Sequence, residues 1–115
     1  MQSGKKSLPL EKTVQKRLIN KLKKIPGLYY FCKEARSIVG IPDLIICYKG
    51  RFIAIEVKRC IWEIYNKDLS MKTSGRHLRQ LLEMDKIRAA GGYATFAYPE
   101  NEEEVYKWLQ DIAAL

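Results

Sequence analysis

The stretch that decides the fold is GIPDLIICYKGRFIAIEVK, residues 40–58. It contains two isoleucine-rich runs, of the kind that form buried strands, joined by the dipeptide Lys49-Gly50. A lysine-glycine dipeptide between two strands predicts a two-residue hairpin turn, in which Tyr48 faces Arg51. That pair fixes the register, because each step back along one strand is matched by a step forward along the other.

The same register places two carboxylates opposite one another. Asp43 faces Glu56, and opposed residues of an antiparallel pair share one face of the sheet, with Cβ atoms about 4.5–5.5 Å apart. Two carboxylates this close repel, so a cation is expected between them, and Mg²⁺ and Mn²⁺ prefer such oxygen ligands. Lys58 follows Glu56 at the strand period of two and projects from the same face. The alternative is an exposed cluster in which Lys58 alone neutralises the acids.

The residues around the carboxylates suit this geometry. Pro42 stiffens the entry to the acid-bearing strand, and Gly40 permits backbone conformations that are closed to other residues. Together they would fix the direction of the Asp43 side chain. The other face of the second strand is predicted to be core, and its residues are Ile53, Ile55 and Val57. On the side of Glu56 the strand is expected to be polar, with Ala54 preceding the acid.

Outward from this hairpin the pattern predicts elements in the order α-β-β-β-α-β-α. The remaining elements are expected at residues 9–25 (helix), 28–33 (strand), 76–90 (helix), 93–98 (strand) and from Asn101 onward (helix). Gly91-Gly92 is expected to end the second helix, and Asn101 with Glu104 to cap the last. The fold class is therefore predicted as α/β, a mixed central sheet flanked by helices. One domain over residues 9–115 would follow a flexible basic arm over residues 1–8.

Length and composition limit the class of protein. At 115 residues, 47% hydrophobic and 30% charged, the chain suits one globular domain and not a disordered one. No apolar run approaches the roughly 18–20 residues that span a bilayer, so a soluble cytoplasmic protein without a membrane partner is expected. Cys32, Cys47 and Cys60 lack C-x-x-C spacing, which predicts reduced structural thiols and not a zinc site.

Basic side chains dominate most of the chain. Residues 1–98 hold 20 Lys+Arg and 8 Asp+Glu, a balance of +12, whereas residues 99–115 hold 1 and 5, a balance of −4. A basic body suits a polyanionic partner, because each phosphate contact releases counterions. A surface that serves only solubility is the alternative. The leading candidates for phosphate contacts are Lys12, Lys16, Arg17, Lys21, Lys23, Lys24, Lys72, Arg76 and Arg79.

Four short motifs occur along the chain in a set order. They are Glu11 in the first predicted helix, Gly40-Ile41-Pro42-Asp43, then Glu56-Val57-Lys58, and Gln80 in the second predicted helix. Over residues 9–98 this set resembles the virus-type replication-repair nuclease (VRR-NUC) family, a branch of the PD-(D/E)XK nuclease superfamily. The resemblance implies a restriction-endonuclease-like core and a metal-dependent endonuclease that acts on DNA.

The resemblance also implies roles for individual residues. The catalytic set would be Asp43, Glu56, Lys58, Gln80 and Glu11. The ligands of one or two Mg²⁺ or Mn²⁺ ions would be Asp43, Glu56, the Val57 carbonyl and, directly or through water, Glu11. Lys58 would orient the attacking water or stabilise the developing charge, and Gln80 would position substrate or water. For Glu11 and Gln80 the alternative is a role in core packing.

Small members of this family that stand alone resemble dimeric endonucleases, of phage or bacteria, that cut four-way (Holliday) DNA junctions. One active site cuts one strand, so resolving a junction needs two sites related by a two-fold axis. Trp62, Tyr65 or the last helix are the candidate contacts between two copies. The alternatives are a nuclease of other preference (flap, nicking, restriction-type or RNA-directed) and a non-catalytic DNA-binding module.

Two features match none of the motifs. Residues 59–75 form a long, mixed segment that is expected to contact substrate or a second copy, with a flexible loop as the alternative. His77 is expected on the helix surface.

Overall fold

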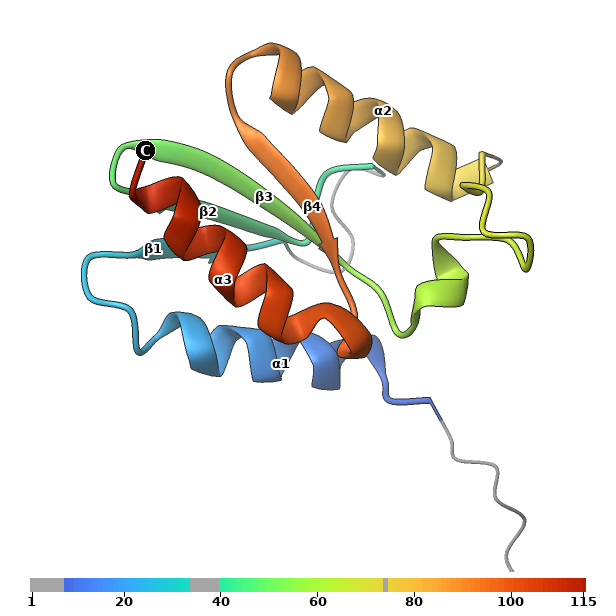
Figure 1. The fold of residues 1–115 in the computed structure, drawn as a ribbon, viewed down its shortest axis with the longest axis horizontal. Coiled ribbons are helices and arrows are strands. Elements are labelled where there is room, and N and C mark those ends of the chain that lie inside the picture. The colour runs from blue at the N-terminus through green and yellow to red at the C-terminus, as the bar shows by residue number, and fades with distance from the viewer. Residues whose placement is uncertain (1–7, 34–39, 74) are drawn as a thin grey trace, which may run out of the picture.

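The chain folds as a mixed α/β structure with a four-stranded mixed sheet flanked by helices (Figure 1). The computed structural model describes residues 8–33, 40–73 and 75–115, so all of the predicted basic arm except Leu8 lies outside the described residues. The elements are α1 (Glu11–Leu22), β1 (Tyr29–Cys32), β2 (Leu44–Tyr48), β3 (Arg51–Val57), the 3-10 turn η1 (Ile61–Glu63), α2 (Gly75–Ala89), β4 (Tyr93–Ala97), the 3-10 turn η2 (Pro99–Asn101) and α3 (Glu102–Ala113).

The sheet has the strand order β1-β2-β3-β4, with β4 parallel to β3 and the other neighbours antiparallel. The predicted hairpin register is confirmed, since Tyr48 pairs with Arg51 and Leu44 with Ile55. Lys49 and Gly50 both have positive φ, 52° and 76°, as the tight two-residue hairpin turn requires. Asp43 was predicted to lie within this strand, which is wrong by one residue, because β2 begins at Leu44.

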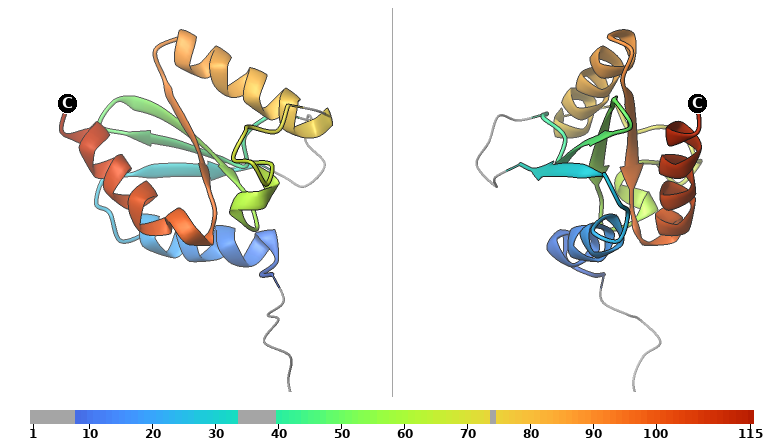
Figure 2. Two further views of the ribbon diagram at one scale, coloured as in Figure 1. Left: turned by 45° about the vertical axis from the view of Figure 1, so that its right-hand side comes forward. Right: turned by 90° about the vertical axis from the view of Figure 1, so that its left-hand side faces the viewer.

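Helices cover both faces of the sheet (Figure 2). On one face α1 and α3 enclose the larger core, whose buried residues are Val14, Leu18, Leu22, Ile25, Leu44, Ile46, Ile53, Ile55, Val57, Ala97, Val105, Leu109 and Ile112. On the other face α2 packs over β3 and β4, and the buried residues there are Ala54, Ile64, Met84, Ala94 and Phe96. Both layers form because each helix carries one apolar stripe toward the sheet.

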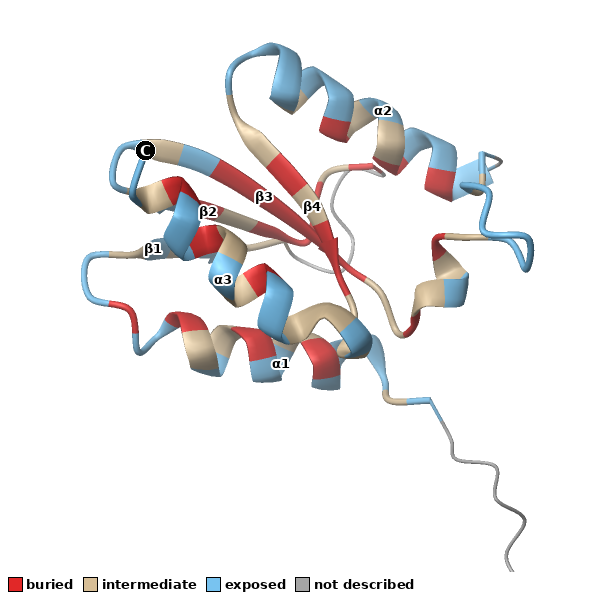
Figure 3. Cartoon of the chain, viewed as in Figure 1, coloured by how far each residue is buried: buried red, intermediate tan, exposed pale blue. Residues whose placement is uncertain are grey.

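Strand β3 is buried on both sides from Ile53 to Val57, as the colouring of Figure 3 makes visible. The odd-numbered residues form core as predicted. The side of β3 that carries Glu56 was predicted to be polar. This is wrong for Ala54, which is only 1% exposed because α2 lies over it. Glu56 is therefore enclosed between a sheet and a helix and does not lie at an open surface.

The ends of the helices show where local signals succeeded. Gly91 has φ +93°, and α2 ends before it as predicted. Helix α1 ends at Leu22, earlier than predicted. The predicted cap of the last helix is wrong, because the Asn101 side chain does not bond to the turn that follows. Its amide oxygen accepts from the Tyr98 N–H, and its amide nitrogen donates to the Phe96 carbonyl.

The segment after β3 has local structure over its described residues, 59–73. It contains η1, a single β-bridge between Tyr65 and Met71, and a backbone hydrogen bond from Lys72 N to Ile64 O at 2.9 Å. The buried Ile64 anchors it against the α2 layer. The segment therefore returns the chain to the end of the sheet where β3 finishes.

Among the described residues, no helix is both long and apolar enough to cross a membrane. Cys32, Cys47 and Cys60 are all free thiols, with Cys60 buried, Cys32 half-buried and Cys47 exposed.

Candidate functional site

The two predicted carboxylates meet at the end of the β2–β3 pair. Asp43 lies one residue outside the ladder, and its backbone carbonyl accepts a hydrogen bond from the Lys33 N–H at 2.8 Å. Its side chain reaches across to β3, where Oδ2 accepts from the Val57 N–H at 2.8 Å. This bond holds the Asp43 carboxylate beside the backbone that carries Glu56. Gly40, at φ +94° and packed against the Arg79 backbone, allows the turn that brings Asp43 into place.

Glu56 is a buried carboxyl group with an unusual environment. The residue is 2% exposed, and its Oε2 atom has no hydrogen-bond partner among the described residues. Burial, followed by the hydrogen bonding and negative charge of Asp43, raises the pKa of the Glu56 carboxyl to about 9. Lys58 and Lys33 act in the opposite direction but do not cancel these effects. An acid of this kind stays protonated at neutral pH unless a cation joins it.

Lys58 and Gln80 are brought into direct contact. The Lys58 Nζ donates to the Gln80 Oε1 at 2.5 Å, and the same ammonium lies 5.7 Å from the centre of the Phe96 ring. Gln80 is buried on the sheet-facing side of α2, one turn before Met84. The predicted position of Gln80 on the face that touches the sheet is therefore confirmed, and its amide fixes the direction of the lysine.

Asp43, Lys58 and Gln80 line one polar cavity of about 320 Å³, and the buried Glu56 lies behind Asp43 and not on its wall. Its lining residues are Glu11, Lys33, Asp43, Lys58, Glu63, Lys72, Arg76, His77 and Gln80. They come from α1, from the ends of β1 and β3, from the segment after β3 and from α2. The first turns of α1 and α2 and the C-terminal ends of β3 and β4 all lie at the same end of the molecule (Figure 1). Segments that are far apart in the sequence thus converge on the carboxylates.

Glu11 stands at the first position of α1, beside the cavity. Partial burial, and then the charge of Asp43, raise the pKa of its carboxyl. Within residues 8–33, 40–73 and 75–115, no group of three or more His, Cys, Asp or Glu side chains is arranged to hold a metal ion. Glu11 therefore does not complete a cage with Asp43 and Glu56, and its role as a ligand stays a prediction.

Two carboxylates nevertheless fit one class of cation. Mg²⁺ keeps several of its waters and is commonly bound through one or two carboxylates, so it does not need a complete protein cage. The unpartnered Oε2 of Glu56, next to the Asp43 carboxylate, is the kind of buried acceptor that a hard cation would satisfy. Zn²⁺, which takes Cys, His and carboxylate ligands in a closed tetrahedron, does not fit this pair. The donor set thus suits Mg²⁺ or Mn²⁺.

Three cavity residues were not predicted as part of the site. Lys33 places its Nζ 3.9 Å from Asp43 Oδ1 and donates to the Ile41 carbonyl at 2.9 Å. Glu63 accepts from the Arg59 N–H at 2.7 Å and lines the cavity. No local signal in the sequence marks these two. They join the site only because β1 and η1 end beside Asp43.

The third is His77, and the prediction that it lies on the helix surface is wrong. It is 7% exposed, stacks on Phe96 with ring centres 5.2 Å apart, and its Nδ1 has no partner among the described residues. Burial, and then the charges of Lys58 and Lys72, lower the pKa of its imidazole. The signal was available, since His77 lies three residues before Gln80 on the buried stripe of α2.

The predicted phosphate contacts divide into three groups. Lys12, Lys72 and Arg76 line the carboxylate cavity or the one that adjoins it. Arg17 and Lys21 are instead paired with the first turn of α3, at 3.1 Å to Glu102 and 3.1 Å to Glu103 respectively. The remaining candidates are exposed, and they are Lys16, Lys23, Lys24 and Arg79. The basic body and the acidic end of the chain thus partly neutralise each other within the molecule.

Comparison of the chain with protein-family models, with curated proteins and with solved structures found no match.

Proposed function

We propose that this protein is a divalent-metal-dependent endonuclease that hydrolyses phosphodiester bonds of DNA. The observation that supports this most strongly is the buried pair of Asp43 and Glu56, in which Glu56 has an unpartnered carboxylate oxygen and Asp43 lines a cavity together with Lys58 and other cations. Buried acids without a partner cost stability, so they are retained where a ligand uses them. A cation would satisfy the acids, and a phosphate beyond it would face the lysine and arginine side chains of the cavity wall.

The metal would be Mg²⁺ or Mn²⁺, held by the Asp43 and Glu56 carboxylates. When bound, it would supply Lewis-acid chemistry, lowering the pKa of a water molecule and stabilising negative charge on the phosphate. The Val57 carbonyl and Glu11, the remaining ligands implied by the resemblance to VRR-NUC nucleases, would complete its environment directly or through water. The Val57 N–H is already occupied by Asp43, which keeps this backbone next to the pair.

Lys58 would act on the reacting groups themselves. Its ammonium is fixed by the Gln80 oxygen at 2.5 Å, which leaves its remaining donors for a phosphate oxygen or the attacking water. Gln80 would thus serve as a positioning residue. Lys33, beside Asp43, would offset part of the negative charge of the carboxylate pair. This division of roles is that of a PD-(D/E)XK nuclease with a restriction-endonuclease-like core.

The cations around the cavity would bind neighbouring phosphates. Lys72 and Arg76 approach from the segment after β3 and from α2, and Lys12 from the first turn of α1. Such contacts carry no base sequence, so specificity would come from the shape of the DNA backbone. Branched DNA is the favoured substrate, with four-way junctions foremost. A symmetric homodimer would supply the two active sites that resolving a junction requires.

Cleavage assays on labelled four-way junctions, flaps, linear duplex DNA and RNA, with Mg²⁺, Mn²⁺ or EDTA, test the proposal. We expect nicking that requires the metal, favours junctions and falls by at least about 10³-fold in Asp43→Asn and about 10²–10³-fold in Lys58→Ala. Matched controls are Asp111→Asn and Lys107→Ala on α3, which should cleave like the wild type. Binding without cleavage would identify a non-catalytic DNA-binding module, and equal cutting of all duplexes would refute the junction preference.

A further inference from the structure

One part of the sheet carries exposed aromatic side chains. Helix α2 packs over β3 and β4 and reaches Ile45 on β2, so the same face of β1 has no helix over it among the described elements (Figure 2). Tyr29 and Phe31, two residues apart on β1, are 68% and 58% exposed, and Phe52 on β3 is 48% exposed. Tyr30 and Cys32, which alternate with the first two, pack against the opposite core.

The register shows that these aromatic side chains share one surface. Tyr29 pairs with Cys47, which pairs with Phe52, so the three lie in one row across three strands. Phe31 pairs with Ile45 in the next row. We call the surface formed by Tyr29, Phe31, Ile45, Cys47 and Phe52 the open face. Neighbouring strands lie about 4.8 Å apart and alternate residues about 7 Å apart, so the rings form a nearly continuous floor.

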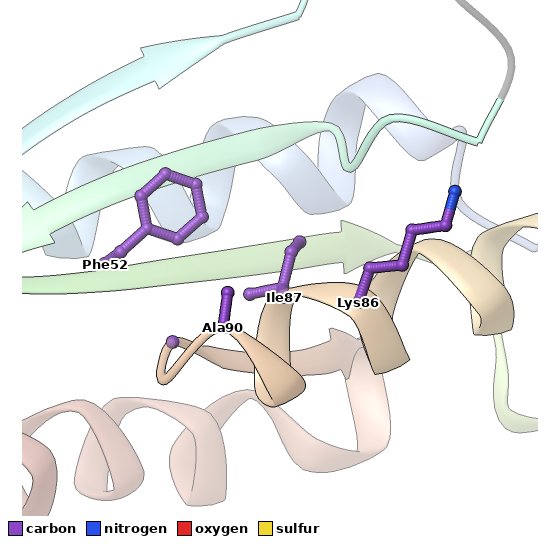
Figure 4. Close-up of a pocket in the computed structure, with 5 residues that line it drawn as sticks. Phe52, Lys86, Ile87 and Ala90 are labelled. Atoms are coloured by element: carbon purple, nitrogen blue, oxygen red, sulfur yellow. The ribbon is translucent and has the colours of Figure 1, made fainter.

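One side of α2 forms a positive border to this floor. Arg79 packs against Gly40, and Arg76 shares a cavity wall with Lys33, so this side of the helix faces β2. A further apolar cavity of about 310 Å³ lies between Phe52 on the sheet and Lys86, Ile87 and Ala90 on α2 (Figure 4). The same side of α2 carries Glu83, which pairs with Lys86 at 3.8 Å. Three cations against one acid leave this border positive.

The open face leads directly to the carboxylate site. Along β1 the residues on this face are Tyr29 and Phe31, and the next in the alternation is Lys33, whose Nζ lies 3.9 Å from Asp43 Oδ1. The aromatic floor thus leads along one strand to the carboxylate site, with the cationic border of α2 beside it. Interfaces between proteins have few charges at their centre, whereas sites for unpaired nucleotides combine stacking rings with cations.

We propose that the open face binds unpaired bases of a nucleic acid whose backbone continues into the carboxylate site. Tyr29, Phe31 and Phe52 would stack on the bases, and Arg76, Arg79 and Lys86 would contact the phosphates. The inference rests on the proposed nuclease function and narrows its substrate class. The DNA next to the scissile bond would be single-stranded, as it is at a flap, a frayed end or a junction whose central base pairs have opened.

Fluorescence anisotropy in EDTA tests this inference without any cleavage. The probes are a labelled single-stranded DNA of mixed sequence, the same strand annealed to its complement, and a strand of equal length built from abasic sites. The wild type should bind the single strand more tightly than the abasic strand. Phe31→Leu should weaken binding of the single strand about 10-fold, and the pair Tyr29→Leu with Phe31→Leu should weaken it further, because a stacked base contributes about 1–3 kcal/mol.

Three controls make the result specific. Phe31→Trp keeps a stacking ring and should bind like the wild type. Leu82→Ala removes an exposed side chain of α2 outside the open face and should also bind like the wild type. Neither leucine variant should change binding of the abasic strand. Circular dichroism melts exclude unfolding as the cause of any loss.

The inference is overturned if the leucine variants bind the single strand like the wild type, or lose the abasic strand equally. It is also overturned if light scattering finds a wild-type dimer that these variants dissociate without a change in base binding, since a second copy then covers the face. Because no metal is present, the outcome is independent of catalysis. If the protein binds unpaired bases through this face but cleaves no DNA, the inference stands and the proposed nuclease function fails.

Discussion

The two faces of β3 differ in what covers them and in what they bury. Ile53, Ile55 and Val57 point into the core beneath α1 and α3, which two helices seal completely. Ala54 and Glu56 point toward α2, a single helix that leaves a polar cavity at its first turn. The first face supplies the stability of the domain. The second buries a carboxyl group beside Asp43, and a buried acid without a full set of partners costs stability.

The largest effect on folding is expected at the sealed face. Ile55 is fully buried, so Ile55→Ala should lower the free energy of unfolding by about 2–5 kcal/mol, through lost burial and the cavity left behind. Urea denaturation followed by circular dichroism measures the change. The matched control on the same strand is Phe52→Ala, which removes a half-exposed ring and should cost less than about 1 kcal/mol. Equal losses in both variants would mean that the two faces do not differ as described.

The second effect is the pH dependence that Glu56 imposes on the metal-free protein. Its folded pKa of about 9 lies above the ordinary value of 4.5, so the folded state holds a proton that the unfolded state releases between these values. The stability from Glu56 is therefore complete below pH 4.5 and is lost as the pH rises toward 9, by at most about 1.4 kcal/mol per pH unit.

Urea midpoints of the wild type and Glu56→Gln, compared at several pH values in EDTA, isolate this contribution. Glutamine does not titrate, so the variant should become the more stable of the two as the pH rises, and the difference should grow with pH. A constant difference across the range would show that Glu56 ionises normally and that the carboxylate pair is not strained.

Metal binding should offset the folding stability that is lost by burying the Glu56 carboxyl group. A cation that binds only the folded state stabilises it by about 2.7 kcal/mol at a concentration of 100 times its dissociation constant. Mn²⁺ should therefore raise the melting temperature of the wild type, and more at higher pH, because Glu56 must release its proton first. Asp43→Asn and Glu56→Gln should lose the shift. A shift that survives in both variants would place the metal elsewhere.

The smallest effect is expected far from the cavity, where α1 meets α3. Arg17 and Glu102 form a partly exposed ion pair with 3.1 Å between Nε and Oε1. A double-mutant cycle with Arg17→Gln and Glu102→Gln should give a coupling free energy of about 0–1 kcal/mol that declines in salt.

The variant Arg17→Gln also tests DNA binding. It should weaken the binding of DNA less than Arg76→Gln does, because Arg17 is paired with Glu102 within the molecule. A greater loss for Arg17→Gln would assign α1 to the DNA interface.

Short-range patterns predicted the hairpin and its register correctly. The turn at Lys49-Gly50 admits one tight geometry, and the alternation of β3 fixes which residues share a face. The same alternation could not reveal that Ala54 lies under a helix, because coverage depends on the packing of a distant segment. Asn101 shows a related limit, since its side chain bonds back to the chain before it and does not cap the helix after it.

The sequence by itself determined the strand pairing that brings Asp43 beside Glu56, since turn chemistry and side-chain period are local properties. Only the tertiary structure decided what surrounds them. Lys33, Glu63 and His77 join the cavity of Asp43 from three separate elements, and for Lys33 and Glu63 no spacing along the chain encodes that convergence. The burial that raises the pKa of Glu56 was likewise decided by the tertiary structure. Desolvation is produced by every element packed around a group and not by its neighbours in sequence.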